Sequence, residues 1–233
     1  MIIVLYTHIG EMLSGLAWDS YFWKMPDSVR TRISRYRRWE DRQAGLFGKL
    51  LLAEGLRRCG YPPDHLRNLV WDASGRPFVG CGMDFNISHS GAYVVCAFCP
   101  AGRVGIDIEE IRPIDIQDFI AQMTRNQWES LMASENRIEA FFNLWTQKEA
   151  VIKADGRGIA IPLNEIIVEG EKAFLADDVW RMKEVRIADG YCCHLATNRK
   201  NQEVRTEKIY FHRKVKTTGF QPVSFSHAIF SND

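Results

Sequence analysis

The chain has 233 residues, and 30 Lys and Arg against 29 Asp and Glu residues give it a formal net charge of +1. This balance excludes a strongly basic protein that binds nucleic acid or anionic membranes through its overall charge. With 46% hydrophobic and 25% charged residues, the composition is that of a globular protein, and the length suits one large domain or two fused half-size units. No apolar run reaches the roughly 20 residues that a membrane helix needs.

The N-terminal region is predicted to fold into a strand followed by two helices. An apolar strand is expected over Ile2–Thr7, and because it lacks the basic flank and cleavage site of a signal peptide, we expect a cytoplasmic protein. Ser28 is expected to cap the first helix, whose apolar stripe comprises Val29, Ile33 and Tyr36. The second helix is expected over residues 40–58, with Gly60 ending it.

Short strands follow, and then the order of helices and strands is repeated. Strands are expected over Leu69–Asp72, Phe85–Ser88, Tyr93–Phe98 and Val104–Glu109, and again over Ile166–Glu169, Glu184–Ala188 and Tyr191–Ala196. Helices are expected between these groups over Ile116–Met123, Trp128–Met132 and Ile138–Lys153. We therefore predict an α+β fold with antiparallel hairpins, divided into an N-terminal half, residues 1–103, and a C-terminal half, residues 104–233. No residue-level repeat links the halves, and residues 198–233 form a basic tail without a predicted role.

The predicted strand at residues 104–109 places two carboxylates on one face. Side chains alternate along a strand, so Asp107 and Glu109 project together while Val104, Ile106 and Ile108 enter the core. Neighbouring carboxylates repel each other unless they face water, have a raised pKa or bind a cation. The segment is therefore either the exposed face of a half-buried strand or part of a cation site.

Two further segments could carry chemistry. Glu149 and Lys153 lie one turn apart at the end of the helix predicted over Ile138–Lys153, on the face that also carries Trp145. They form either a surface ion pair or a functional pair there. Residues 86–91 lead from a strand into Ser-His-Ser-Gly, where hydroxyls and backbone amides can converge on an anion. In this segment His89 is either a hydrogen-bonded turn residue or a ligand-binding residue.

Three segments of the chain together resemble the Sfp-type 4′-phosphopantetheinyl transferases. They are Asn-Ile-Ser-His-Ser (86–90), Gly-Ile-Asp-Ile-Glu (105–109), and Trp-Thr-Gln-Lys-Glu-Ala (145–150) with Lys153. The resemblance covers about residues 4–196. It implies a pseudo-twofold α+β monomer of two similar halves with coenzyme A bound in the cleft between them. The implied enzyme is of the holo-[acyl-carrier-protein] synthase type and depends on Mg²⁺. It transfers the 4′-phosphopantetheine group of coenzyme A to a serine hydroxyl of an apo acyl or peptidyl carrier protein, releasing adenosine 3′,5′-bisphosphate. Carriers of polyketide, nonribosomal peptide and fatty acid biosynthesis all fit this description.

The resemblance also implies residue roles. Asp107, Glu109 and Glu149 would hold the Mg²⁺ ion, for which carboxylate oxygens completed by phosphates are suitable ligands. The implied catalytic residues are Glu149 as the base for the serine proton, directly or through water, Lys153 at the departing pyrophosphate, and Asp107. The implied coenzyme-binding residues are Arg32, Arg76, Pro77, Ser88, His89 and Lys153.

Two positions depart from the family pattern. Gln127 stands where the family often has an acidic residue, and Gly45 stands where a Thr near the 3′-phosphate is frequent. Arg112 and Arg125 are expected to form a basic rim for an acidic carrier helix. The alternative to an enzyme is a non-catalytic module on the same fold that binds coenzyme A or a carrier protein. The complete set of three carboxylates with Lys153 favours the enzyme.

Overall fold

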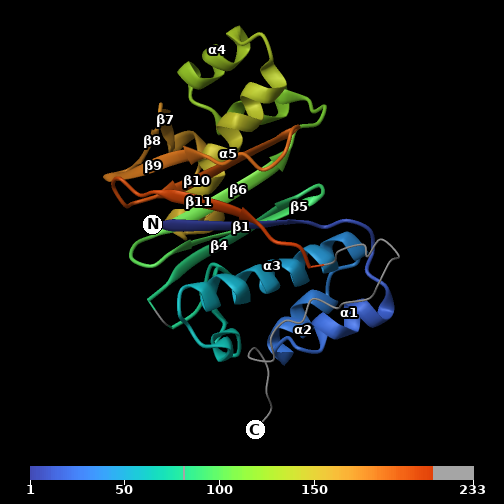
Figure 1. Cartoon of the computed structure of the whole chain (residues 1–233). Coiled ribbons are helices and arrows are strands. Elements are labelled where there is room, and N and C mark those ends of the chain that lie inside the picture. Colours follow the sequence, from blue (N-terminus) through green and yellow to red (C-terminus); the bar gives the residue numbers. More distant parts are fainter. Residues whose placement is uncertain (81, 212–233) are drawn as a thin grey trace.

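The computed structural model describes residues 1–80 and 82–211, which form helices and strands of an α+β protein and confirm the predicted fold class (Figure 1). The α-helices are α1 (Gly15–Phe22), α2 (Asp27–Ser34), α3 (Trp39–Arg58), α4 (Arg125–Ala133) and α5 (Arg137–Asp155). Short 3₁₀ helices are η1 (Pro63–Leu66), η2 (Ile116–Gln122), η3 (Gly158–Ala160) and η4 (Leu163–Glu165). The strands are β1 (Ile2–His8), β2 (Val70–Trp71), β3 (Pro77–Phe78), β4 (Asp84–Ser90), β5 (Tyr93–Cys99), β6 (Val104–Glu110), β7 (Ile167–Glu169), β8 (Lys172–Leu175), β9 (Asp178–Glu184), β10 (Tyr191–Thr197) and β11 (Val204–Lys208).

The two large sheets share a topology. Their strand orders are β11-β1-β5-β4 and β6-β10-β9-β8-β7. In each, the chain forms a first strand, β1 or β6, then a long helix, α3 or α5, and later two strands of which the second pairs antiparallel with the first strand. The order β1-β5-β4 therefore corresponds to β6-β10-β9.

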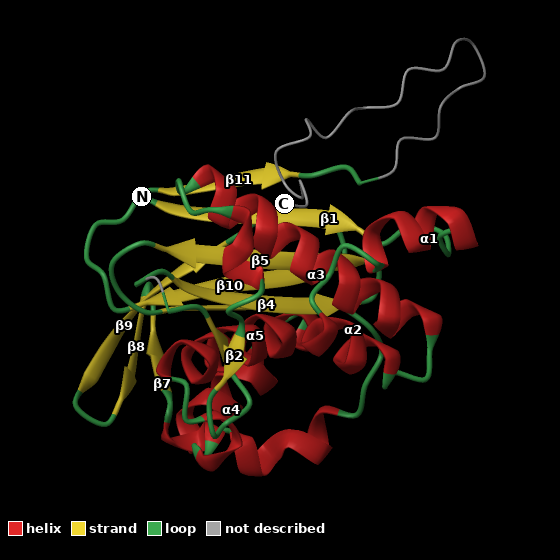
Figure 2. Ribbon diagram, turned by 90° about the horizontal axis from the view of Figure 1, so that it is seen from below, coloured by secondary structure: helices red, strands yellow, loops and turns green. Residues whose placement is uncertain are grey.

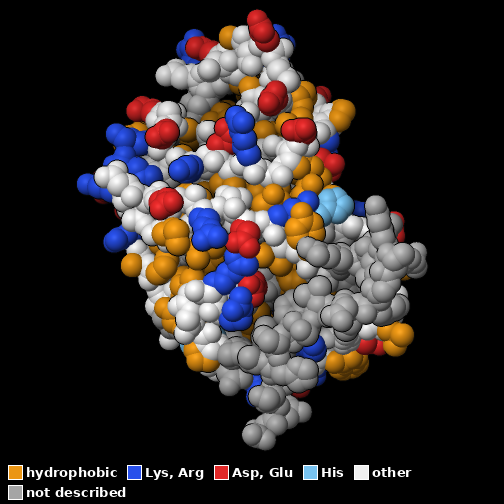
Figure 3. Space-filling view, viewed as in Figure 1, with side chains coloured by type: hydrophobic (Ala, Val, Ile, Leu, Met, Phe, Trp, Pro, Cys, Tyr) orange, Lys and Arg blue, Asp and Glu red, His pale blue; other side chains and the backbone are white. Residues whose placement is uncertain are grey.

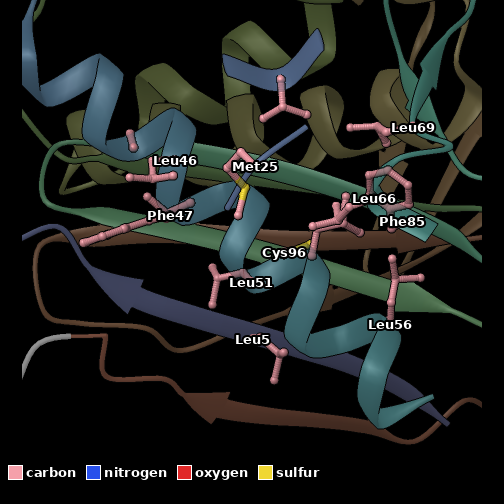
Figure 4. Packing of buried hydrophobic residues seen from close by; sticks show 14 of the residues in the cluster. Leu5, Met25, Leu46, Phe47, Leu51, Leu56, Leu66, Leu69, Phe85 and Cys96 are labelled. Carbon is pink, nitrogen blue, oxygen red and sulfur yellow. The ribbon is translucent and has the colours of Figure 1, made fainter. Parts of the chain in front are cut away.

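Each sheet has one face covered by its long helix. Helix α3 packs against β1, β5 and β4, and the apolar side chains between them include Leu51, Leu5 and Phe85 (Figures 2 and 4). Helix α5 packs in the same way against β6 and β10. The opposite faces of the two sheets meet in a separate apolar cluster that includes Val4 and Ile106. The alternation of side chains in β6 thus places Ile106 between the sheets and leaves Asp107 to face α5.

Most predicted elements are found within a few residues of their expected bounds, but two predictions were wrong. Helix α2 begins at Asp27 with Pro26 in the N-cap position, so Ser28 lies inside the helix and Tyr36 beyond it. Proline suits a helix start because its fixed φ and missing N–H cost nothing there. Of the strand expected over residues 184–188, only Glu184 lies in a strand, as the last residue of β9. Val185 still donates a backbone hydrogen bond to Cys193, and the ladder then stops while Val185 and Ile187 pack against the core cluster between the sheets.

Several elements were not predicted: the helix α1, the strands β3, β8, β9 and β11, and the short 3₁₀ helices η1, η3 and η4. Strand β11 lies within the tail of residues 198–233 and pairs in parallel with β1, Ile2 opposite Val204. This part of the tail thus completes the first sheet, while residues 212–233 lie outside the described residues. None of the helices in the described ranges has the length and apolarity to cross a membrane. Acidic and basic side chains are both spread over the face seen in Figure 3, in keeping with the near-zero net charge.

Candidate active site

The two sheets are joined by side chains of β4 that bind the edge of β6. Every second residue of β4 accepts a hydrogen bond from a backbone N–H of β6, so that side chains substitute for a backbone ladder. The acceptors are Asp84, Asn86, Ser88 and Ser90, which bind the N–H groups of Val104, Ile106, Ile108 and Glu110 at 2.7, 3.0, 3.4 and 3.1 Å respectively. The junction fixes the register of the first half against the strand that carries the acidic pair.

Asp107 is at the centre of a polar cluster beside this junction. Its side chain is 4% exposed. Its Oδ1 accepts hydrogen bonds from Ser88 Oγ at 2.9 Å and from Lys153 Nζ at 2.5 Å, and Lys153 Nζ also lies 2.9 Å from Ser88 Oγ. The second carboxylate oxygen, Oδ2, is buried and has no hydrogen-bond partner. An unpartnered carboxylate oxygen in a buried position is costly, which marks this atom as a site for a ligand.

Glu109 and Glu149 lie next to Asp107. Ser90 Oγ donates to Glu109 Oε2 at 2.7 Å, and Glu149 is half-buried on α5. Burial raises the pKa of both carboxyls, and the charge of Asp107 raises it further, while Lys153 opposes the change. The three carboxylates therefore share one electrostatic environment, as the repulsion expected from the sequence requires.

The close approach of α5 to β6 depends on Gly105. A Cβ atom at this position would lie 2.1 Å from the carbonyl oxygen of Ala150 and 2.3 Å from the amide nitrogen of Ala154. Only glycine lets a helix backbone approach a strand this closely. The same approach brings Lys153 against Asp107, so the glycine of the Gly-Ile-Asp-Ile-Glu segment has a direct structural purpose.

The donor set suits a hard cation although the side chains are not arranged as a finished site. Among residues 1–80 and 82–211, no three His, Cys, Asp or Glu side chains converge closely enough to hold a metal ion. The unpartnered Oδ2 of Asp107 and the two neighbouring carboxylates with raised pKa values nevertheless supply the oxygen ligands that Mg²⁺ prefers. The residues fit the expected ion by chemistry.

Arg76 is bound inside the protein. Its Nη2 lies 2.8 and 2.9 Å from the two carboxylate oxygens of Asp84 and 3.0 Å from the carbonyl oxygen of Val104. The side chain is 10% exposed, and its Nη1 is buried without a partner. Pro77 follows at the start of β3, opposite Trp71. Arg76 thus ties the β2–β3 hairpin to the junction of the sheets, and one of its nitrogens remains available.

Arg32 and His89 lie on the other side of the junction, towards α3. The guanidinium of Arg32 stacks on the ring of Trp71 at 4.3 Å from the centroid. His89 has an exposed ring, yet surrounding protein atoms and the Lys153 cation lower the pKa of its imidazole. The charges that act on His89 also include Asp41 and Lys49 on α3. The site residues predicted from the sequence therefore extend from Arg32, across Ser88, to Glu149.

Gln127 accepts a hydrogen bond from a buried lysine. Lys148 is 0% exposed, and its Nζ donates to Gln127 Oε1 at 2.6 Å and to the carbonyl oxygen of Gln122 at 2.8 Å. Burial lowers the pKa of Lys148 to about 8. Gln127 also forms a capping box with Thr124 at the start of α4. Gln127, which differs from the family pattern, therefore binds the α5 residue Lys148, next to Glu149 in the sequence.

Some residues of the site were not found from the sequence. His194 is 4% exposed, faces Asp107 across β10 and β6, and lies 2.8 Å through Nδ1 from Thr146 Oγ1. Burial lowers its pKa to about 4. The roles of Asp84 and Asn86 in joining the sheets were not predicted either, although Asn86 lies in one of the segments that carry the resemblance. Polar residues at every second position of a predicted strand are a signal that could have found these two, whereas nothing near His194 in the sequence marks it.

Arg112 and Arg125, the expected basic rim, are exposed, and Arg125 pairs with Glu129 at 2.8 Å. One of the two cations of the expected rim is therefore already in an ion pair.

Comparison with known proteins identifies the family. Residues 15–101 match the model described as 4′-phosphopantetheinyl transferase, N-terminal, and residues 103–195 match the model described as the 4′-phosphopantetheinyl transferase superfamily. The chain belongs to the Sfp-type 4′-phosphopantetheinyl transferase family. The two matches meet between Ala101 and Arg103, next to the start of β6.

Curated relatives match the chain over part of their length. The 4′-phosphopantetheinyl transferase gsp of Aneurinibacillus migulanus is 37% identical over 58% of this chain and 57% of its own length. The 4′-phosphopantetheinyl transferase Sfp of Bacillus subtilis is 30% identical over 60% and 63%. The L-aminoadipate-semialdehyde dehydrogenase-phosphopantetheinyl transferase of Schizosaccharomyces pombe is 31% identical over 65% and 66%. The chain thus spans less than two thirds of each of these relatives.

Proposed function

We propose that this chain transfers the 4′-phosphopantetheine group of coenzyme A to a serine hydroxyl of an apo acyl or peptidyl carrier protein and releases adenosine 3′,5′-bisphosphate. The observation that carries the proposal is the convergence of Ser88, Asp107 and Lys153 beside two further carboxylates. Membership of the transferase family supports the same reaction. A module that only bound coenzyme A would not need three carboxylates around a lysine.

Asp107, Glu109 and Glu149 are the proposed ligands of a Mg²⁺ ion. When bound, the ion would supply Lewis-acid stabilisation of the negative charge that develops on the pyrophosphate. Within the protein, Asp107 Oδ2 is the ligand atom best prepared for this role because it is buried and has no other partner. The hydrogen bond from Ser90 Oγ orients the carboxylate of Glu109.

Glu149 is the proposed base. Its pKa is raised by burial and by Asp107, so its carboxylate holds a proton more readily than an exposed one does. In the reaction, the serine hydroxyl of the carrier gives its proton to Glu149 as oxygen attacks the phosphorus of the phosphopantetheine group. The bond from that phosphorus to the bridging oxygen breaks, and the electron pair leaves with adenosine 3′,5′-bisphosphate. Lys153 Nζ, already held between Ser88 and Asp107, can donate to this leaving phosphate.

The coenzyme is proposed to lie along the junction of the two halves, residues 1–103 and 104–233. Ser88 and His89 would face its 3′-phosphate, as would Arg32. The β2–β3 hairpin with Arg76 and Pro77 would border the adenine. The duplicated strand order and the family matches on either side of residue 102 support two halves with a shared site. We place the reaction in the cytoplasm and expect a monomer to suffice, since all the proposed residues come from one chain.

The test is the mass of a carrier protein. An apo carrier incubated with coenzyme A, Mg²⁺ and this chain should gain the mass of one phosphopantetheine group. Carriers of polyketide, nonribosomal peptide and fatty acid synthesis should be tried in parallel, because their acidic helices are alike. If none gains mass while coenzyme A still binds in calorimetry, the non-catalytic binding module is the correct function.

A further inference from the structure

Lys49 lies on α3 above a position that lacks a side chain. It follows Gly45 by four residues, so the two share one side of the helix. That side faces α2, since a Cβ at Gly45 would lie 3.2 Å from the ring of Tyr36 and 3.6 Å from Ile33. Side chains on a helix lean towards its N-terminus, so the long side chain of Lys49 extends over the turn that contains Gly45.

The charges around Lys49 leave its cation without a partner. Its side chain is half-buried and forms no hydrogen bond or ion pair with any residue in the ranges 1–80 and 82–211. Arg32 is close enough to act on it, and Lys49 in turn acts on His89. Burial and the like charge of Arg32 both lower the pKa of the Lys49 ammonium group. Arg32 on α2 and Lys49 on α3 thus carry like charges that act on each other, and a bound anion would stabilise such a pair of cations.

His89 completes this cluster from the sheet. Along β4 the residues Phe85, Ile87 and His89 alternate with the four that bind β6, so they face α3. The partner of His89 on β5 is Val94, which lies near the middle of α3 beside Gly48. His89 therefore meets α3 close to Gly45. Two carboxylates act on the imidazole: Asp41, one turn before Gly45 on α3, and Asp107 on β6.

We infer that Lys49 binds the 3′-phosphate of coenzyme A together with Arg32 and His89, and that its ammonium group replaces the hydroxyl that Gly45 cannot supply. The inference rests on the proposed function, because the coenzyme provides the anion. The pyrophosphate is assigned to Asp107 and Lys153 on the other side of Ser88, which leaves the 3′-phosphate, a dianion, for the cluster on α3. Arg32 is held for this purpose by its stack on Trp71.

The test compares Lys49→Met with Lys49→Arg and with the control Lys24→Met, which removes an exposed lysine on the loop after α1. The probes are adenosine 3′,5′-bisphosphate and adenosine 5′-monophosphate, whose binding is measured by calorimetry. A charge-assisted hydrogen bond contributes about 1.5–3 kcal/mol, so Lys49→Met should weaken bisphosphate binding by roughly tenfold to a hundredfold. Binding of the monophosphate should not change. Lys49→Arg should restore most of the affinity, and Lys24→Met should resemble the wild type.

Equal losses for both probes, or no loss for the bisphosphate, would overturn the role of Lys49. A wild-type chain that binds the two probes equally well would overturn it too. The melting temperature of each variant separates a binding defect from misfolding, and Lys49→Arg keeps the inference testable if Lys49→Met is unstable. The protein could also bind adenosine 3′,5′-bisphosphate through Lys49 and yet modify no carrier. That result would contradict the proposed transfer reaction but leave the role of Lys49 intact.

Discussion

The two halves of the molecule place different residues at corresponding positions of one topology. In the first half, Leu5 of β1 lies opposite Cys96 of β5, and both are buried under α3. In the second half, Asp107 of β6 lies opposite His194 of β10, and both are buried under α5. The contact of α3 with the strand pair β1–β5 is therefore apolar at this position, whereas the contact of α5 with the strand pair β6–β10 is polar. A duplicated scaffold can therefore use one copy for stability and reserve the other for chemistry.

The largest loss of stability and activity is expected from a substitution at Gly105, where the contact between β6 and α5 requires their backbones to lie close together. Gly105→Ala would place a methyl group 2.1 Å from the carbonyl oxygen of Ala150, which is backbone and cannot move aside. We expect a loss of about 3 kcal/mol or more in the free energy of unfolding, measured by urea denaturation, and loss of transfer.

The matched control is Gly48→Ala on α3, where the methyl group would meet a side-chain carbon of Ile87 at 3.0 Å. A side chain can shift and alanine favours the helix, so we expect a change within about 1 kcal/mol. Similar losses of unfolding free energy for Gly105→Ala and Gly48→Ala would contradict this prediction. They would show that the packing of α5 on its sheet does not require a closer backbone approach than the packing of α3.

The next largest effect is a fall in kcat, caused by a substitution at Glu149 that leaves the fold unchanged. Glu149→Gln keeps the shape of the side chain but removes the base and a proposed metal ligand. We expect kcat to fall by roughly a hundredfold to ten-thousandfold while the melting temperature stays within a few degrees. Glu139→Gln, an exposed change on the same helix, is the control and should leave kcat unchanged. Unaltered turnover by Glu149→Gln would remove this residue from the mechanism.

The third effect is the acid sensitivity of the second half. Burial lowers the pKa of His194 to about 4 from 6.5, so the unfolded chain takes up this proton first as the pH falls. Between pH 6.5 and 4 the free energy of unfolding should therefore decrease, with up to about 3 kcal/mol due to this residue. His194→Gln should remove that part of the pH dependence in urea titrations. An identical slope in the variant would show that His194 is not held neutral.

The sequence could predict most of the strands and helices of the two sheets, but not which of them pack against each other. The alternation in Val104, Ile106 and Ile108 correctly predicts β6, because a strand with one apolar face follows from local spacing alone. The same alternation after Glu184 was misleading, since Val185 and Ile187 both pack on a core although the ladder to β10 stops at the hydrogen bond from Val185 to Cys193. Strand β8 was missed because it is short, with only Ala173 and Leu175 buried, although it lies between β7 and β9 in the sheet.

The candidate site was predicted to the extent that its residues lie in compact segments. Asp107, Glu149 and Lys153 lie in such segments, and the structure brings Lys153 to Asp107. The roles of Lys49 and His194 depend on which helix or strand lies opposite, and this depends on contacts between segments far apart in the chain. No spacing within a single sequence reports such contacts.

The central claim is that the polar contact under α5 performs the chemistry and the apolar contact under α3 does not. The most direct test replaces Asp107 and His194 with Leu and Cys, the pair found at the corresponding positions of the first half. Asp107→Leu removes the carboxylate partner of Lys153, whose side chain is 27% exposed and can turn towards water, so part of the stability is lost with the ion pair. We therefore predict that Asp107→Leu/His194→Cys still unfolds cooperatively, with a lower melting temperature than the wild type, and adds no phosphopantetheine mass to a carrier that the wild type modifies. Transfer at the wild-type rate by this folded double variant would contradict the account.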